Sequence, residues 1–423
     1  MKIDKNNKFA LNTTWLVIGR AVQIGLTFIM ALLVPRYLGP SDYGAIQYTY
    51  SFVAILVPVA NLGLNEIIVK ELVDNKDKND EIIGTVIVIK LIGAIVSTIL
   101  LYLIIQVMGM DSKSIIITLL QALTLLFQSF ECITYFYQSK LLSSKPAIIN
   151  VITYVATTIF RVVGLMINKD VKWFAFAVSL DHIVLALLLL CCYLYEGHKI
   201  CFSKDTGIKL LSKSKNYLFA SLMIVIYDQT NKLLLGYFFD DTAVGLLSAA
   251  TQLCNAWPFV LTAIIDSASP IIIDLFQKDK ELFNKRLKQL YASIFYIGLL
   301  VALVFTLFSK PIIGIIYGPA YAGSSIPLKI VSWSTIFAYF GVSRSIWMQC
   351  NNKLKYEKNI SVVGAVSNVV LNLILITIFG INGAAIALTL TQFITNFVMV
   401  YIIKDTRENA LLLVDAIRLK GVL

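Results

Sequence analysis

The sequence predicts an all-α integral membrane protein of about twelve transmembrane helices, on two observations. Hydrophobic residues make up 58% of the 423 residues and charged residues only 14%, whereas soluble domains have about 45–50% and about 25%. Apolar runs of about 20 residues, the length that crosses a bilayer, recur along almost the whole chain. This composition excludes a soluble globular enzyme, and the short loops leave no room for a separate soluble domain.

Twelve apolar runs give the candidate spans. The segment 309–326 is rich in proline and glycine, so it is expected to be an outer loop or a re-entrant piece. The pair Trp257-Pro258 interrupts the eighth run. The candidate spans are 12–34, 45–68, 82–107, 115–137, 146–167, 171–195, 215–238, 243–268, 290–308, 327–349, 359–379 and 383–403.

The distribution of basic residues predicts the orientation. If the N-terminus is cytoplasmic, the inner segments hold 25 Lys and Arg and the outer segments hold 5. Such a bias in short loops is typical of cytoplasmic sides, so both termini are expected in the cytoplasm. The net charge of +11 is scattered between apolar runs, a pattern of membrane topology rather than of a nucleic-acid partner.

The longest inner connection, 196–215, divides the chain into two six-helix bundles, 1–205 and 206–423. Weak internal similarity favours a duplication, since Tyr37 and Gly44 follow the first span much as Tyr237 and Gly245 follow the seventh. Six spans in each half make the repeats parallel, an architecture typical of rocker-type transporters.

Several motifs resemble one known family. They are NTTW at 12–15 and RYLGPSDYG at 36–44, then VGLLSAA at 244–250, NVVLN at 368–372 and FGINGAAIA at 379–387, with Asp228, Gly236 and Pro270. In order and spacing they are similar to the polysaccharide-transport family, with its Wzx-type O-antigen flippases, of the multidrug/oligosaccharidyl-lipid/polysaccharide exporter superfamily. Leu247 departs from the pattern, since relatives often carry Tyr there.

The resemblance implies a fold, a substrate and partners. The fold would be MATE-like, with two bundles around a central cavity. The protein would be a flippase that moves an undecaprenyl-diphosphate-linked oligosaccharide, such as an O-antigen repeat unit of lipopolysaccharide, from the inner to the outer leaflet of the bacterial cytoplasmic (inner) membrane. Its partners would be the lipid-linked oligosaccharide, membrane lipids, and the polymerase and chain-length proteins of that polysaccharide biosynthesis pathway.

Four cations within predicted spans are candidate substrate ligands: Arg20, Lys90, Arg161 and Arg344. A charge at a helix centre costs about 2.5–3.5 kcal/mol on insertion scales, so each should face a cavity or a partner. Guanidinium groups can bind the oxygens of a diphosphate bidentately. The alternatives are a structural ion pair, or snorkelling to the membrane interface.

The candidate ion-coupling residues are Asp181, Asp228 and Glu131. Asp228 and Lys232 are one helical turn apart, which favours a plain internal ion pair over an ion site. Asp181 precedes His182, but adjacent helical residues point to different faces, so no dyad of the two is predicted; a lone His in a span is more often an interior hydrogen-bonded residue than a proton relay. Coupling to H⁺ or Na⁺ stays open, and neither a cofactor nor a metal site is expected.

Enzymatic motifs are missing from the sequence, which has no P-loop, no H-E-x-x-H and no G-x-S-x-G. Three other classes remain alternatives. A cation-coupled drug antiporter of the same superfamily would have an acidic or neutral lumen. A membrane glycan polymerase or ligase would need a large outer loop. A major facilitator transporter would share the two-halves pattern without the motifs.

Overall fold

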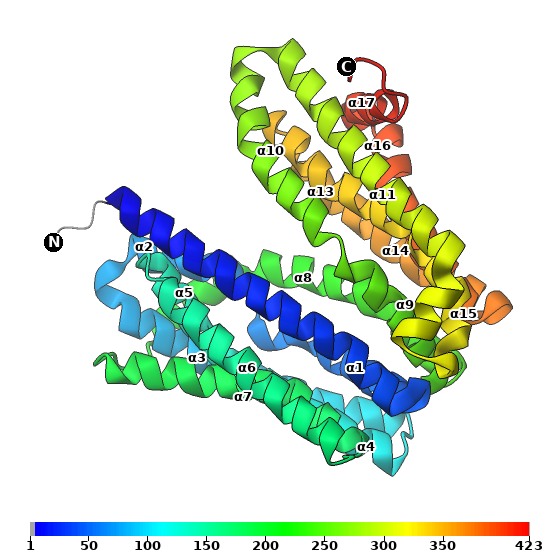
Figure 1. Ribbon diagram of the computed structural model, residues 1–423. Helices are drawn as coiled ribbons and strands as arrows, with labels where there is room; N and C mark the ends of the chain where they lie inside the picture. The colour runs from blue at the N-terminus through cyan, green and yellow to red at the C-terminus, as the bar shows by residue number, and fades with distance from the viewer. Residues whose placement is uncertain (1–4, 423) are drawn as a thin grey trace. The chain divides into compact units, whose positions relative to one another are not determined.

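The computed structural model describes residues 5–422, and these are helical almost throughout (Figure 1). Side chains are described for residue 19 and for residues 22–422. The α-helices are α1 (Lys5–Asn61), α2 (Asn65–Asp74), α3 (Asn79–Val107), α4 (Ser112–Phe127), α5 (Cys132–Ser139), α6 (Ser144–Met166), α7 (Val171–Tyr195), α8 (Lys204–Phe238), α9 (Asp241–Ala256), α10 (Phe259–Lys278), α11 (Lys280–Ile316), α12 (Ser325–Val331), α13 (Ser334–Cys350), α14 (Lys355–Phe379), α15 (Ile381–Phe393), α16 (Met399–Ile402) and α17 (Arg407–Ile417).

Short turns of other helix types join several of these helices. The 3₁₀ turns are η1 (Lys76–Lys78), η2 (Gln128–Glu131), η3 (Pro319–Ser324) and η5 (Lys404–Thr406), and η4 (Ile394–Val398) is a π-helical turn. Turns of these types often mark breaks or functional positions within spans.

The predicted spans correspond to the observed helices. Each of the twelve lies on one helix or on two consecutive helices. Among the described residues, nine helices are long and apolar enough to cross a membrane, and ten if the bent pair α12–α13 is one span. Helix α8 carries the seventh predicted span but is too polar to pass that test. The prediction of an all-α, multi-pass membrane protein is confirmed.

The first two spans form one long helix with a break at Gly39. Gly39 has φ 76° and ψ 169°, a backbone conformation that is open to glycine and strained for other residues. Pro40 follows and lacks the N–H that an uninterrupted helix would need. The two residues therefore end the first span and begin the second.

The segment 309–326 differs in part from its expectation as an outer loop or re-entrant piece, and the re-entrant alternative remains a prediction. Helix α11 continues to Ile316 after a break at Phe308, where φ is −109° and ψ is 16°. Pro311 lies in the first turn after this break, where a missing N–H leaves no hydrogen bond unmade. The loop expectation is wrong for residues up to Ile316, and η3 then leads to the bent pair α12–α13, whose axes meet at 43°.

The chain folds into two compact units. The first contains the residues up to Leu38 and Ala45–Val225, and the second contains Gly39–Gly44 and the residues from Ile226 onward. In the first unit α7 packs against both α4 and α6; in the second, α14 packs against α15 and α10 against α11. The units divide inside α8, whereas the sequence predicts a domain boundary at 205/206. The assignment of six helices to each half remains a prediction.

The connection 196–203 belongs to the first unit because it is fastened to α3. Asp80 accepts hydrogen bonds from the Tyr193 hydroxyl at 2.8 Å and from the backbone N–H of Lys199 at 3.1 Å. The backbone N–H of Ser203 donates to Thr85 Oγ1 at 3.0 Å. These contacts tie this connection, which the sequence predicts to be on the inner side, to the first unit, so it is not a free linker.

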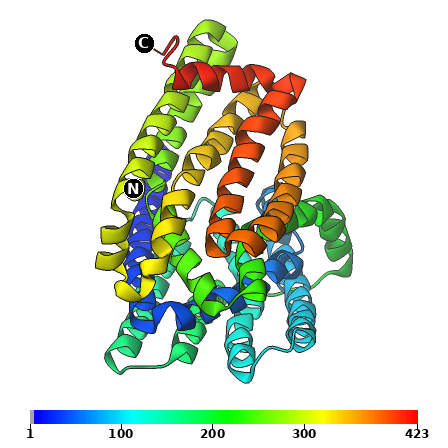
Figure 2. The same ribbon diagram turned by 90° about the vertical axis from the view of Figure 1, so that its right-hand side faces the viewer.

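A C-terminal helix that the sequence analysis did not separate from the tail lies across α11 (Figure 2). Asn409 on α17 donates to the hydroxyl of Tyr291, and both side chains are buried. Asp415 pairs with Lys288 at 2.9 Å. Because one face of α17 is buried against α11, the C-terminal segment is part of the second unit.

Two glycines allow a close backbone crossing within the second unit. A Cβ atom on Gly44 would lie 1.7 Å from the carbonyl oxygen of Asp241, and one on Gly245 would lie 1.9 Å from the carbonyl oxygen of Pro40. The contact is reciprocal, and it joins the two segments that the sequence aligns between its halves. Neither position tolerates a side chain without movement of the backbone.

Gly44→Val and Gly245→Val are therefore expected to lower the thermal unfolding midpoint of the detergent-purified protein clearly, because an inserted side chain forces the backbones apart. Overpacking of this kind typically costs about 1–3 kcal/mol. The matched control is Gly314→Val, since a Cβ on that helical glycine would have no atom within 4 Å. Equal midpoints for all three variants would contradict the close crossing.

Candidate functional site

A polar cavity lies inside the first unit, among helices that are long and apolar enough to cross a membrane. Its volume is about 310 Å³, and its walls come from α1, the η2–α5 turn, α6 and α7. Most of its lining side chains carry a hydrogen-bonding group. The lining residues are Gln23, Glu131, Thr134, Tyr135, Gln138, Asn150, Thr153, Tyr154, Asp181, His182 and Leu185.

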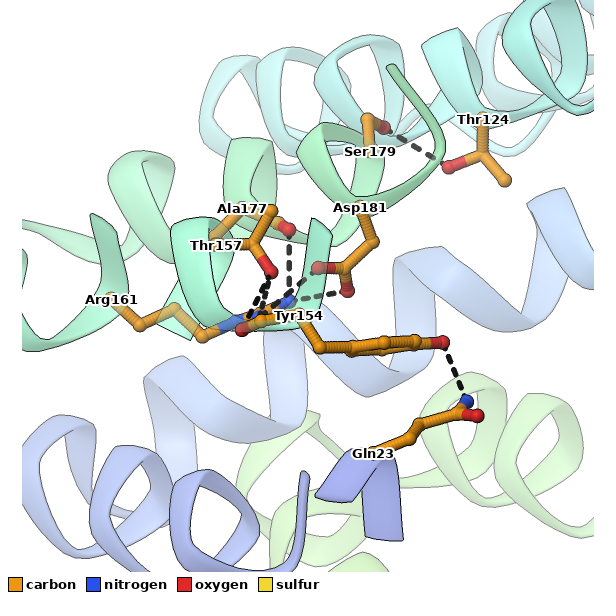
Figure 3. A network of polar contacts seen from close by, with 8 residues as sticks. All are labelled: Gln23, Thr124, Tyr154, Thr157, Arg161, Ala177, Ser179 and Asp181. Atoms are coloured by element: carbon orange, nitrogen blue, oxygen red, sulfur yellow. Dashed lines mark hydrogen bonds and ion pairs between the residues drawn. The ribbon is translucent and has the colours of Figure 1, made fainter. Parts of the chain in front are cut away.

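Arg161 and Asp181 form a bidentate ion pair at this wall (Figure 3). The two guanidinium nitrogens lie 3.2 Å and 2.6 Å from the two carboxylate oxygens. Arg161 Nη2 also donates to the Ala177 carbonyl at 2.9 Å, and Arg161 Nη1 lies 3.4 Å from Thr157 Oγ1. The side chains are 16% and 23% exposed. Arg161 thus has the carboxylate partner of the ion-pair alternative, and its role as a substrate ligand remains a prediction.

A second polar contact joins α1 to α6 in the same cavity. Gln23 Nε2 donates to the Tyr154 hydroxyl at 2.7 Å, as Figure 3 shows. Thr153, on the preceding position of α6, is 1% exposed, and its hydroxyl has no partner among the described residues. A buried hydroxyl without a partner costs free energy, so this part of the wall has unused hydrogen-bonding capacity.

Glu131 and His182 form the third contact. Glu131 Oε1 lies 2.6 Å from His182 Nδ1, and each side chain is 26% exposed. Glu131 ends the 3₁₀ turn η2, which breaks the predicted span 115–137. As expected, His182 makes no dyad with its neighbour Asp181, but the pairing with Glu131 was not predicted. Only tertiary packing brings these residues together, 51 positions apart in the chain.

Lys90 and Arg344 line neither the cavity of the first unit nor the cavity of about 520 Å³ in the second unit. Lys90 is 1% exposed and donates to Asn65 Oδ1. Arg344 is 4% exposed, and it pairs with Glu357 at 2.9 Å and donates to Asn396 Oδ1 at 3.3 Å. These arrangements fit the structural alternative for both residues, since buried cations need partners.

Arg20 stands apart from the other predicted cations. It falls on α1, but its side chain lies outside the described residues. Its role as a substrate ligand therefore remains a prediction from the sequence.

Asp228 and Lys232 line a separate cavity of about 520 Å³ in the second unit. Asp228 Oδ2 accepts a hydrogen bond from Gln229 Nε2 at 2.6 Å. The predicted ion pair of Asp228 with Lys232 remains a prediction. Among the described residues, no three His, Cys, Asp or Glu side chains lie close enough together to hold a metal ion.

The walls of the first cavity carry two acids, one histidine and several neutral hydrogen-bonding groups, and the nearby arginine is held by one of the acids. Charged pairs inside a membrane are costly and are kept mainly on ion or substrate pathways. The arrangement can bind a cation or a proton, and it can exchange the partner of Arg161 for another anion. It contains no covalent nucleophile with an adjacent base.

Comparisons with known proteins agree with this architecture. Residues 9–276 match the family model described as "Polysaccharide biosynthesis protein". The "Putative O-antigen transporter" of Escherichia coli (strain K12) is 23% identical over 95% of this chain and 98% of its own length.

Two solved structures share the fold. The structure titled "Lipid II flippase MurJ, inward closed conformation" superposes with a TM-score of 0.69 at 18% identity, over 96% of this chain and 91% of its own. An inward-facing MATE-family multidrug resistance transporter superposes with a TM-score of 0.64 at 12% identity, over 95% of this chain and 99% of its own.

The fold is thus that of a multi-pass membrane protein with the architecture of MATE proteins and MurJ. These relatives are transporters and flippases rather than enzymes. Because the family model covers more than half of its length, the chain belongs to the polysaccharide biosynthesis protein family.

Proposed function

We propose that this protein is a flippase that moves a lipid-linked oligosaccharide, carried on undecaprenyl diphosphate, from the inner to the outer leaflet of a bacterial cytoplasmic membrane by alternating access. The observation that carries the proposal is the polar, charge-bearing cavity inside a membrane-spanning unit of this family's fold. The near full-length similarity to an O-antigen transporter supports the choice of substrate class.

Arg161 is the proposed ligand of the diphosphate in this cavity. Its planar guanidinium already binds one carboxylate bidentately, and phosphate oxygens match the same geometry. Asp181 would hold the guanidinium between transport events, and the diphosphate would take its place. A site that must release its ligand benefits from such an internal competitor. Arg20, on α1 in the same predicted span as Gln23, is proposed as a second cationic ligand of the diphosphate.

The proposed coupling residues are Asp181, Glu131 and Asp228. Asp181 and Glu131 each face a basic partner in the first cavity, so protonation or cation binding at either acid would change the pairing there. Asp228 lies in the cavity of the second unit. Either H⁺ or Na⁺ could act at these carboxylates.

One observation favours the second candidate, a cation-coupled drug antiporter. The residues lining the first cavity include two carboxylates but no Lys or Arg, which suits a cationic substrate better than an anionic one. The flippase is preferred here because Arg161 at the wall holds a carboxylate bidentately, a geometry that phosphate oxygens match and that a cation pathway does not need.

Deletion of the gene tests the two functions together. If the protein is a flippase, lipid-linked glycan should accumulate in the inner leaflet, protected from membrane-impermeant periodate in intact cells, and the plasmid-borne gene should restore its oxidation. If it is a drug antiporter, glycan distribution should stay normal and the cells should become more sensitive to cationic drugs.

The membrane topology gives an independent prediction. In a background without native cysteines, Asp170→Cys should react with a membrane-impermeant maleimide added outside the cells, and Asp205→Cys should react only after permeabilisation. The charge bias in the loops predicts this orientation, because basic segments stay on the cytoplasmic side. External labelling of residue 205 but not of residue 170 would overturn it.

A further inference from the structure

The cavity of the second unit has a different chemistry from the first. It has a volume of about 520 Å³, within the range of about 300–1,000 Å³ that small-molecule sites occupy. Side chains from α8, α9, α10, α12, α13 and α15 line it. Three of these side chains are amides, those of Asn231, Asn255 and Gln392.

Charge does not dominate this lining, because its charged residues are one acid, Asp228, and one base, Lys232. The other polar lining groups are amides and hydroxyls. A diphosphate site needs an excess of cationic donors, and this cavity lacks one. A neutral ligand with many hydroxyl groups fits the lining better.

Two buried polar atoms lack partners among the described residues. They are Oδ1 of Asn231, whose side chain is almost fully buried, and the hydroxyl of Tyr227. Buried polar groups are nearly always hydrogen-bonded, so each needs an account. An amide oxygen requires a hydrogen-bond donor, which a sugar hydroxyl supplies and an ionised diphosphate does not.

The fold presents the third amide for donation. Gln392 Oε1 accepts a hydrogen bond from Asn396 Nδ2 at 2.7 Å, which leaves the amide nitrogen of Gln392 to donate elsewhere. Asn396 lies in the π-helical turn η4 and is itself held by Arg344. Single π-turns are frequent at functional sites because they redirect side chains. The buried Arg344 thereby orients a lining residue of the cavity.

Aromatic surface completes the lining. Phe259 is 58% exposed at the cavity. The Tyr339 hydroxyl lies 3.2 Å from Thr262 Oγ1 across α13 and α10. A ring with an apolar face beside hydroxyl and amide groups matches a pyranose, which has apolar C–H faces and a polar rim.

We propose that this cavity is a carbohydrate subsite that binds a neutral sugar unit of the transported glycan, separately from the diphosphate. The inference rests on the proposed flippase function and adds to it a second contact region on the substrate. Asn231 and Tyr227 hydrogen-bond to sugar hydroxyls, and Phe259 packs against a ring face.

Binding of two lipid probes to the protein in nanodiscs tests this subsite. One probe is undecaprenyl diphosphate, and the other is the lipid-linked glycan fraction from membranes of a strain that lacks the gene. The wild-type protein should bind the glycan-bearing lipid more tightly. Asn231→Leu should lower the affinity for the glycan-bearing lipid by about tenfold, the effect of one or two hydrogen bonds. Its affinity for undecaprenyl diphosphate should stay unchanged.

Tyr227→Phe removes a single hydroxyl at almost constant volume, so it covers the case in which Asn231→Leu does not fold. Its matched control is Tyr317→Phe, because the Tyr317 hydroxyl is also buried without a described partner but lies outside this cavity. The control should leave both affinities unchanged. The subsite is overturned if the cavity variants lose affinity equally for both lipids. It is also overturned if neither cavity variant loses affinity for the glycan-bearing lipid. Failure of the wild-type protein to bind either lipid would instead refute the proposed function.

Discussion

Arg161→Ala is expected to reduce glycan export to background while the protein remains folded in the membrane. The guanidinium makes two charge-assisted contacts to Asp181, and the same two donors would bind the diphosphate in transport. Losing two such contacts corresponds to a loss of about a hundredfold in affinity. Arg161→Lys should keep part of the activity, because the charge survives while the bidentate geometry is lost. The measurement is the rate of appearance of glycan in the outer leaflet at native expression.

Asp181 provides the control that separates a transport role from a structural ion pair. Removing Arg161 alone leaves the Asp181 carboxylate without its cation, which could itself impair folding. The double variant Arg161→Ala/Asp181→Ala removes both charges. If the pair is only structural, export should return in the double variant; if Arg161 binds the diphosphate, export should stay absent although the double variant is folded. Full export by Arg161→Ala alone would also remove the proposed role.

Arg20→Ala is expected to have the same phenotype as Arg161→Ala, on the sequence argument alone. It lies in the first span together with Gln23, whose side chain reaches the first cavity. Wild-type export in this variant would leave Arg161 as the sole arginine proposed for the diphosphate.

The helices were the most predictable part of the molecule. A span is specified locally, because about 20 consecutive apolar residues are long enough to cross a bilayer and the backbone there must hydrogen-bond within a helix. Accordingly, all twelve predicted spans lie on helices. The ninth predicted span ends at Phe308, where α11 breaks. The continuation of α11 to Ile316 was missed because Pro311 and Gly314 are typical of loops, and the turn η2 was missed because it depends on how neighbouring helices pack against the span.

One ion pair could have been predicted from the sequence. Helices α6 and α7 are joined by a short connection at 167–170, so residues at similar distances before and after it lie at similar depths in the membrane. Arg161 lies five residues before the end of α6 and Asp181 ten residues after the start of α7, a difference that the long arginine side chain spans. The sequence alone leaves an ion pair open for each cation, and a search of the adjacent helix for an acid would have named Asp181 as the partner.

Other parts of the site gave no usable local signal. Glu131 and His182 come from segments that are not consecutive helices, and their contact depends on how η2 packs against α7. The cavity of the second unit combines residues from six helices between Tyr227 and Gln392. Such sets require the tertiary fold, because amides and hydroxyls in spans occur for many reasons.

Arg344→Ala is expected to lower the amount of folded protein strongly. A variant with a defect in transport alone would remain folded. The guanidinium is 4% exposed and is held by Glu357 and Asn396. Removing one member of a buried pair typically costs about 3–5 kcal/mol, because the other charge is left uncompensated. The thermal unfolding midpoint and the yield of monodisperse detergent-purified protein measure this loss. The control is Arg286→Ala, an exposed arginine of the same unit, which should change stability by at most about 0.5 kcal/mol.

A double variant in which both charged residues of the pair are replaced by apolar ones tests whether Arg344 also contacts the substrate, as the sequence predicts. Replacing a buried ion pair by apolar residues of similar volume is often neutral or stabilising, so Arg344→Met/Glu357→Met should recover folded protein. Because Arg344 reaches the second cavity only through Asn396 and Gln392, this double variant should retain most export, with a modest loss from a less well oriented Gln392. A variant that is fully folded but inactive would show that the guanidinium binds the transported anion directly, and the structural assignment of Arg344 would then be wrong.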